Sequence, residues 1–214
     1  PDMFVIGVTG SFGSGKTTVA KMFQKRGAGV IDADRIVHGL LKGKSAAVPK
    51  IARAFGRAVL GRSGIDRAKL GEVVFSDPKR LERLTGILHP LACKTVERMI
   101  AGSRKKVVVI DAPLLIEAGW TRFVDKVVVV KAALPGQVKR IQNRMGLKKA
   151  DILKRIRRQM PLGKKLPFAD FVVDNRGRLA DTDKQVEEIF RVCLSSPEGR
   201  AGTRKPIRRK HSHD

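Results

Sequence analysis

The chain has 214 residues, of which 42% are hydrophobic and 30% charged, and this composition is typical of a folded globular protein rather than a disordered or fibrous one. No apolar run approaches the roughly 18 residues that a membrane span needs, and nothing near the first residue resembles an export signal. The 45 Lys and Arg against 20 Asp and Glu give a net charge of +25, which favours phosphorylated partners.

The first predicted element is a strand over residues 3–8, rich in β-branched side chains. A glycine-rich turn follows it, and residues 16–25 then show the spacing of an amphipathic helix. Residues 29–31 form a second short strand, which ends in Asp32 and Asp34. The pattern is that of a strand, a turn, a helix and a second strand, as in an α/β fold.

Two later strands are predicted at residues 107–110 and 126–130, both nearly continuous valine and isoleucine. Runs that are apolar on both faces belong in a parallel sheet that helices cover on each side. A fifth strand at 171–173 and a closing helix at 181–194 complete the pattern. We therefore predict an α/β fold with a five-stranded parallel sheet flanked by helices.

The segment between the second and third strands, residues 35–100, has a helical pattern and no good strand. It is too long for a simple crossover helix, so we expect a helical insertion at the carboxyl edge of the sheet, where open α/β folds bind ligands. The alternative is a set of extra helices that only thicken the core. Breaks between helices are expected at Gly43, Pro49, Gly61 to Gly64, Pro78 and Pro90.

A basic segment at 137–165 carries Lys and Arg at helical spacing, and Pro135 suits the first turn of its first helix. The residues after 195 are basic and almost free of apolar side chains, which predicts a disordered tail. The expected organisation is a core at 1–34 and 104–195 with a lid at about 137–165, an insertion at 35–103 and a tail at 196–214.

The strongest motif is the sequence GSFGSGKT at residues 10–17, which fits the phosphate-loop pattern G-x-x-x-x-G-K-[ST]. Glycines let backbone N–H groups curl around an anion, and the N-terminus of the following helix adds partial positive charge. We expect Lys16 to reach the terminal phosphates of ATP and the Thr17 hydroxyl to bind Mg²⁺. The alternative is a glycine-rich structural turn. The expected nucleotide contacts are Gly13, Ser14, Gly15, Lys16, Thr17 and Thr18.

A phosphate loop alone does not separate a kinase from a GTPase or a motor. Asp111 ends a valine-rich strand, where a second metal-supporting carboxylate is expected, although it could also cap the next turn. The chain has no N-K-x-D run for recognition of guanine and is short for an ATP-driven motor. The sequence therefore favours a small phosphotransferase.

Phosphoryl transfer to a hydroxyl needs a carboxylate near the acceptor oxygen and cations near the migrating group. Asp32 and Asp34 are the candidates for the carboxylate, although Asp34 could instead be the N-cap of the next helix. Arg140 and Arg144 lie one helical turn apart and suit a lid that closes over ATP. The alternative for this pair is a solvated basic helix.

In combination, motifs from Val5 to about Ile189 resemble those of the dephospho-coenzyme A kinases, a family of P-loop kinases. The loop departs from the family's usual Gly-Gly-Ile-Gly at residues 10–13, and Gly163 replaces a common Glu before Lys164. The motifs are GVTGSFGSGKTTVA (7–20), VIDAD (30–34), IDRAKL (65–70) with VF (74–75), His89-Pro90, DAPLL (111–115) with Glu117, Gln137 with Arg140 and Arg144, Arg155-Ile156 with Gln159, and AD (169–170) before DN (174–175).

The resemblance implies a three-layer P-loop kinase-like fold with a helical acceptor-binding insertion and a lid. It implies transfer of the γ-phosphoryl group of ATP to the ribose 3′-hydroxyl of dephospho-coenzyme A, the last step of coenzyme A synthesis. Asp34 would be the base, with Asp32 beside it, and Arg140 would stabilise the migrating charge. Arg144 and Asn175 would bind ATP, with Asn175 at the adenine. The implied acceptor contacts are Thr9, Asp34, Arg67, His89 and Leu114.

Two other functions remain open: a P-loop kinase that acts on another small hydroxyl or nucleotide acceptor, and a nucleic-acid-binding protein regulated by ATP. Because the basic residues are spread along the chain, we expect only weak electrostatic binding of nucleic acid, and no membrane partner. Cys93 and Cys193 lie far apart, which predicts free thiols in a reducing cytoplasm rather than a disulfide or a zinc site. A monomer or weak homo-oligomer is expected.

Overall fold

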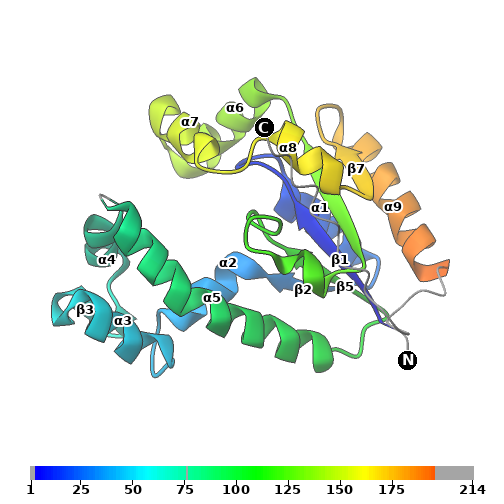
Figure 1. Ribbon diagram of the computed structural model, residues 1–214. Coiled ribbons are helices and arrows are strands. Elements are labelled where there is room, and N and C mark those ends of the chain that lie inside the picture. The colour runs from blue at the N-terminus through cyan, green and yellow to red at the C-terminus, as the bar shows by residue number, and fades with distance from the viewer. Residues whose placement is uncertain (1–2, 76, 196–214) are drawn as a thin grey trace, which may run out of the picture. The chain divides into compact units, whose positions relative to one another are not determined.

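The computed structural model describes residues 3–75 and 77–195 (Figure 1). The tail at 196–214, predicted to be disordered, lies outside the described residues. The described chain forms two compact units, one within Pro1–Val30 and Arg104–Asp214 and the other Ile31–Ser103. Each unit has a hydrophobic core of its own.

A five-stranded sheet is the centre of the first unit, with the strand order β2-β5-β1-β6-β7. Strand β1 pairs in parallel with β5, with Ile6 opposite Val109, and also with β6, which in turn pairs in parallel with β7. The predicted sheet is therefore confirmed, with strand ends that differ from the expected ones by one residue. The strands are β1 (Phe4–Thr9), β2 (Gly29–Asp32), β5 (Val107–Asp111), β6 (Lys126–Lys131) and β7 (Phe171–Asp174).

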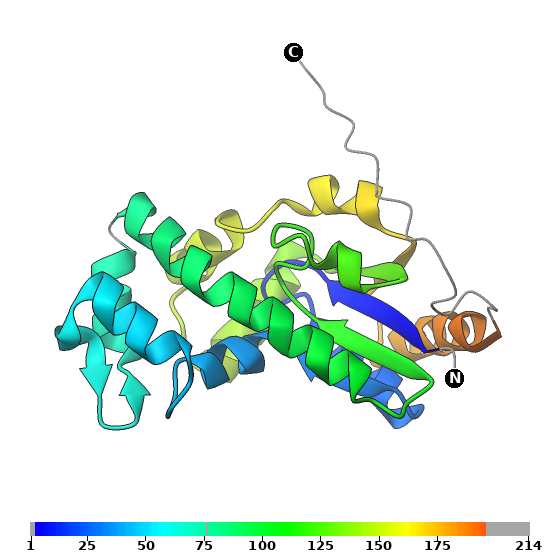
Figure 2. The same ribbon diagram turned by 60° about the horizontal axis from the view of Figure 1, so that its bottom comes forward.

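The central strands are buried on both faces, as their continuous apolar sequence requires. Phe4, Ile6 and Val8 of β1 share one core cluster with α1 (Lys16–Lys25) and α9 (Leu179–Ser195). These two helices lie together on one face of the sheet (Figure 1 and Figure 2). On the opposite face, a Cβ on Gly7 would lie 2.6 Å from Leu115, so β1 is closely covered there as well.

The chain between β6 and β7 folds into short helices that continue the first unit. Helix α6 begins with a proline in its first turn, as predicted for Pro135. The basic segment thus consists of helical pieces joined by short loops. They are α6 (Leu134–Met145), α7 (Lys149–Arg157), α8 (Leu162–Lys165) and the 3₁₀ turn η3 (Leu166–Phe168), and a further 3₁₀ turn, η2 (Trp120–Phe123), precedes β6.

The second unit is mainly helical, and among its described residues none of the helices combines the length and apolarity needed to cross a bilayer. The prediction that it contains no strand is wrong, because β3 (Leu60–Gly61) and β4 (Gly64–Ile65) form an antiparallel pair. Two residues per strand are too few to leave an alternating pattern in the sequence. The helical elements are α2 (Ala33–Leu40), α3 (Ala47–Phe55), the 3₁₀ turn η1 (Arg57–Val59), α4 (Arg67–Val74) and α5 (Pro78–Ala101).

Two of the expected helix breaks are also wrong. Pro49 lies in the first turn of α3, where the missing N–H removes no helical hydrogen bond. Helix α5 continues through Pro90, although an interior proline costs about 3 kcal/mol in an exposed helix. Leu84 before the proline and Val96 and Ile100 after it are buried in the same helix, and this packing keeps the two halves together.

Both cysteines are free and buried, as predicted. Burial raises the pKa of the Cys193 thiol from its ordinary value of 9.0 to about 11. The protonated thiol therefore stabilises the fold fully below pH 9, and this contribution is lost as the pH rises through about 11. We expect the free energy of unfolding to fall more steeply between pH 9 and 11 in the native protein than in Cys193→Ala, as measured by urea denaturation. Parallel curves for the two proteins would contradict this.

Candidate functional site

The glycine-rich loop connects β1 to α1, and its shape depends on three glycines with positive φ. Gly10, Gly13 and Gly15 have φ values of 153°, 78° and 95°. A Cβ at Gly10 would lie 2.6 Å from the carbonyl oxygen of Val130, and one at Gly15 would collide with the amide of Asn175. Larger residues are therefore excluded by both conformation and space.

The loop leads into the N-terminus of α1, which begins at Lys16 with Gly15 as its N-cap. Among the residues that the structure describes, no side chain caps this helix end, and the first turn contains no acidic residue. Its first backbone N–H groups and the helix dipole are thus directed at the space that the loop surrounds. This arrangement is an anion-binding site of the kind that holds phosphate groups.

Two buried side chains mark the inside of the loop. Lys16 is 8% exposed, and its Nζ donates to the carbonyl oxygen of Ser11 at 3.3 Å, so the cation is held across the loop. Ser14 is fully buried, and its Oγ has no hydrogen-bond partner among the described residues. An unsatisfied buried hydroxyl is costly in a folded protein unless a ligand or water completes it.

Thr17 and Asp111 come from α1 and from the end of β5, and the fold brings them together. The Thr17 hydroxyl donates to Asp111 Oδ2 at 2.9 Å, and Asp111 is only 6% exposed. The sequence placed these two residues at one metal site, and the structure puts their oxygens in contact. Thr18 follows on the exposed side of the first turn of α1.

Asn175 directly follows β7 and its side chain holds the phosphate loop at Ser14. Its Nδ2 donates to the carbonyl oxygen of Ser14 at 2.8 Å, and its Oδ1 accepts from Thr182 Oγ1 at 3.0 Å. The side chain is 4% exposed, so both ends of the amide are used on protein groups. Contact of Asn175 with adenine stays a prediction, since the described side chain serves the phosphate loop.

Next to Asn175, Asp174 is held in its charged form. The Arg176 guanidinium hydrogen-bonds both carboxylate oxygens and keeps the pKa of Asp174 below its ordinary value of 3.8. The Asp174 backbone N–H and carbonyl oxygen are both bonded to the Gln185 side chain of α9. The turn that carries Asn175 is therefore fixed from both sides.

Sequence reasoning missed Lys165, the last residue of α8. Its side chain is fully buried, and its Nζ donates to Glu117 at 2.9 Å and to the carbonyl oxygen of Pro113 at 2.8 Å. The ammonium group also lies 3.5 Å from Thr9 Oγ1, which itself donates to Pro113. A lysine in a basic segment looks like a surface residue, and its acidic partner lies 48 positions away in the sequence. The motif that contains Glu117 assigns it no such role.

This ion pair makes an asymmetric prediction about stability. Lys165→Met leaves Glu117 with a side chain that is 22% exposed, whereas Glu117→Ala leaves a fully buried ammonium group. We expect Lys165→Met to lower the free energy of unfolding by about 2 to 3 kcal/mol and Glu117→Ala by about 3 to 5 kcal/mol, in urea titrations. A larger loss for Lys165→Met than for Glu117→Ala would contradict the assigned burial.

The arginines predicted for the lid, Arg140 and Arg144, lie on α6 and are both exposed. Leu114, predicted to bind the acceptor, follows β5 and is 47% exposed. These three residues and the phosphate loop belong to the first unit.

The paired aspartates lie at the beginning of the second unit's first helix. The suggestion that Asp34 is the N-cap is wrong: Asp32 is the N-cap of α2, and its Oδ1 accepts from the backbone N–H of Arg35 at 3.0 Å. Asp34 lies within the first turn and is exposed. Asp32 thus caps the helix, and Asp34 is exposed in its first turn.

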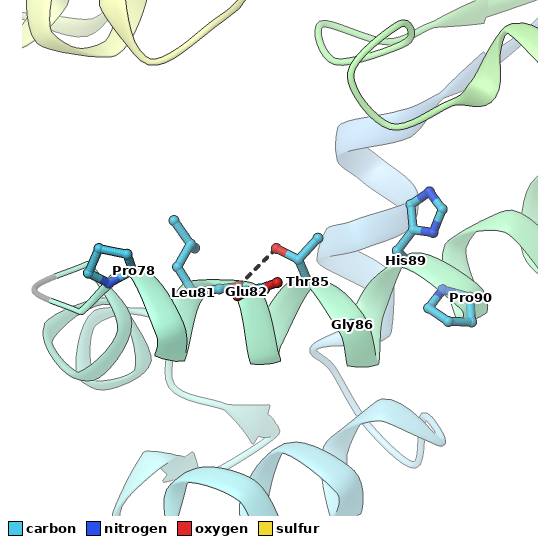
Figure 3. Close-up of a pocket in the computed structure, with 7 residues that line it drawn as sticks. All are labelled: Pro78, Leu81, Glu82, Thr85, Gly86, His89 and Pro90. Carbon is cyan, nitrogen blue, oxygen red and sulfur yellow. Dashed lines mark hydrogen bonds between the residues drawn. The ribbon is translucent and has the colours of Figure 1, made fainter.

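The other two predicted acceptor residues lie on separate helices of the second unit. Arg67 is the first residue of α4 and is exposed, after Asp66, which caps the helix. His89 lines an open cavity of about 560 Å³ along α5, together with Thr85, Gly86 and Pro90 (Figure 3). The imidazole also lies 3.7 Å from the Cys93 sulfur, one helical turn further on.

Comparison with known proteins agrees with this geometry. A family model described as dephospho-CoA kinase matches residues 4–181. A dephospho-CoA kinase from Methylococcus capsulatus is 38% identical over 190 residues, covering 88% of this chain and 96% of the relative.

Solved structures show the same likeness. TT1252 from Thermus thermophilus has a TM-score of 0.79 at 32% identity, covering 90% of this chain and 98% of that one. Dephospho-CoA kinase from Campylobacter jejuni has a TM-score of 0.65 at 28% identity, covering 87% and 95%. With a phosphate loop backed by Thr17 and Asp111, and a family match over most of its length, this chain belongs to the dephospho-CoA kinase family.

Proposed function

We propose that this protein transfers the γ-phosphoryl group of ATP to the ribose 3′-hydroxyl of dephospho-coenzyme A, which yields coenzyme A. The observation that carries the proposal is the contact between Thr17 and Asp111 beside the phosphate loop, in a chain of this family. The loop supplies the nucleotide site, and the family supplies the acceptor.

Within the nucleotide site, the residues have distinct tasks. Backbone N–H groups of Gly13, Ser14 and Gly15 surround the phosphates, and Lys16 moves from the Ser11 carbonyl to the terminal phosphate oxygens. Thr18 adds a contact at the α-phosphate. Arg140 and Arg144, on the lid at about 137–165, lower the cost of the charge that develops on the migrating group.

The donor atoms around Thr17 fit Mg²⁺. A hydroxyl and a buried carboxylate oxygen are hard ligands, and Mg²⁺ is commonly held by one or two carboxylates together with substrate phosphates. Among the described residues there is no cluster of three or more His, Cys, Asp and Glu side chains suited to a metal. Thr17 and Asp111 would hold the ion, which neutralises charge on the phosphates when it is bound.

On the acceptor side, we assign proton removal to Asp34, because Asp32 is engaged as a helix cap and Asp34 is exposed. In this proposal the helical segment 35–103 binds dephospho-coenzyme A, with Arg67 and His89 as its contacts there. Thr9 and Leu114 are the acceptor contacts that we propose in the core at 1–34 and 104–195. Both cysteines are free thiols, which supports placement of the protein in the reducing cytoplasm.

A coupled assay of ADP release tests the proposal. With ATP, Mg²⁺ and dephospho-coenzyme A, we expect turnover that depends on all three components and produces coenzyme A. Other nucleosides and small alcohols, offered as acceptors at the same concentration, serve as the control for specificity. Folded protein without turnover on dephospho-coenzyme A would overturn the assignment, and faster turnover on another acceptor would replace the substrate.

A further inference from the structure

Three consecutive residues of the phosphate loop, Ser11 to Gly13, each contact the lid segment. The backbone N–H of Phe12 donates to Gln159 Oε1 at 2.8 Å. The hydroxyl of Ser11 donates to Gln137 Oε1 at 3.3 Å, and Gln137 is itself 4% exposed. The space above Gly13 is filled by the side chain of Ile141, 2.6 Å from the position of a Cβ.

The Phe12 side chain extends this contact into the hydrophobic core of the lid. Its ring packs against the cluster of Val138, Ile141 and Ile152, and the Arg155 guanidinium lies 5.8 Å from the ring centroid. Such a cation–π contact adds to the apolar packing. The loop therefore inserts an aromatic side chain into the lid. Movement of the lid away from the loop would break these contacts.

The residues that follow Gln159 connect the same segment to a second loop. The backbone N–H of Met160 donates to Glu117 Oε1 at 3.0 Å, and Lys165 binds both Glu117 and the Pro113 carbonyl. The lid is thus attached to the phosphate loop through Gln159 and to the loop after β5 through Met160 and Lys165. Of these three residues, Gln159 is the one whose side chain hydrogen-bonds the described phosphate loop.

We propose that Gln159 and Phe12 are positioning residues that couple the lid to the phosphate loop, so that the conformation of the lid sets the affinity for ATP. The inference rests on the proposed function, because it takes ATP as the ligand of the loop and 137–165 as the lid. Gln159 touches no phosphate in this arrangement: it holds the backbone of Phe12, and through it the neighbouring N–H groups that surround the anion.

Removal of the amide oxygen of Gln159 tests the role of its hydrogen bond with Phe12. Gln159→Met keeps the length and packing of the side chain but loses the acceptor for the Phe12 N–H, and one such hydrogen bond corresponds to about a fivefold change in affinity. We expect the dissociation constant of a fluorescent ATP analogue to rise about fivefold in Gln159→Met. Gln142→Met, the same change at an exposed glutamine of α6, should bind the analogue as the native protein does.

Steady-state kinetics separate positioning from general damage. We expect the KM for ATP to rise in Gln159→Met, while kcat, the KM for dephospho-coenzyme A and the unfolding temperature stay at native values. Phe12→Ala should weaken ATP binding in the same way, and Phe12→Leu, which keeps an apolar side chain in the lid cluster, should restore most of it. Because both substitutions act on one contact, the double variant Phe12→Ala/Gln159→Met should lose less affinity for ATP than the product of the two single losses.

Native affinity for ATP in Gln159→Met, or an equal loss in Gln142→Met, would overturn the inference. The binding measurement uses no acceptor, so it is independent of the substrate assignment. Native protein that binds ATP but does not phosphorylate dephospho-coenzyme A would refute the proposed function, and the coupling of lid and loop would still be tested by the same variants.

Discussion

Asp34→Asn is expected to reduce phosphoryl transfer by about 10²- to 10⁴-fold, the usual contribution of a general base, while ATP binds with unchanged affinity. Asparagine has nearly the same shape as aspartate but cannot accept the proton of the acceptor hydroxyl. Asp34 is exposed in the first turn of α2, so the isosteric exchange should leave the helix in place. Rates of coenzyme A formation and an ATP titration measure the two effects.

Asp32→Asn is the matched control for this variant. Asparagine caps a helix about as well as aspartate, so the bond to the Arg35 N–H and the fold of α2 should persist. We expect Asp32→Asn to retain most of the native rate. Loss of transfer in Asp32→Asn together with a native rate in Asp34→Asn would move the base to Asp32.

Asp111→Asn is expected to lower activity by about 10- to 100-fold and to raise the Mg²⁺ concentration needed for half-maximal rate. The amide oxygen can still accept from the Thr17 hydroxyl, so the contact at 2.9 Å survives while the negative charge is lost. A magnesium titration at saturating ATP measures both changes. An unchanged magnesium dependence in the folded variant would remove Asp111 from the metal site.

Two substitutions of Thr17 test whether its hydroxyl is a ligand of the same ion. Thr17→Ser keeps the hydroxyl, and we expect it to retain the native magnesium dependence. Thr17→Val keeps the shape of the side chain but has no oxygen for the ion or for Asp111, so it should shift the magnesium dependence at least as far as Asp111→Asn. Equal behaviour of the two Thr17 variants would show that the hydroxyl is not a ligand.

The part of the site that the sequence predicted is the part coded locally. Residues 10–17 contain the whole phosphate loop, and the strand before it and the helix after it have clear periodicity, so β1, the loop and α1 were predictable together. Asp111 was predictable because it ends a strand of continuous valine and isoleucine, and parallel strands end at the same edge of the sheet.

The contacts that the sequence could not predict join residues far apart in the chain. Lys165 and Glu117 are 48 positions apart, and Gln159 and Phe12 are 147 apart. Such pairs have no fixed spacing, and a lysine in a basic segment is more often solvated than buried. Asn175 is a similar case, because the chain folds back to place its amide under Ser14.

Errors in the second unit have local causes. The alternative that Asp34 caps α2 is wrong by two residues at the start of the helix, because Asp32 is an equally good cap. The sequence predicts a break at Pro90 because proline is unfavourable inside a helix, but burial of the apolar stripe of α5 on both sides of it outweighs that preference.

In the proposed reaction, the phosphate loop delivers the γ-phosphoryl group of ATP to one hydroxyl of one acceptor. Phosphorus NMR of a reaction with ATP and dephospho-coenzyme A identifies that hydroxyl. We expect a new phosphomonoester signal coupled to the ribose H3′ proton, which grows in step with ADP. Growth of inorganic phosphate alone, or of a phosphomonoester at another position of the acceptor, would contradict it.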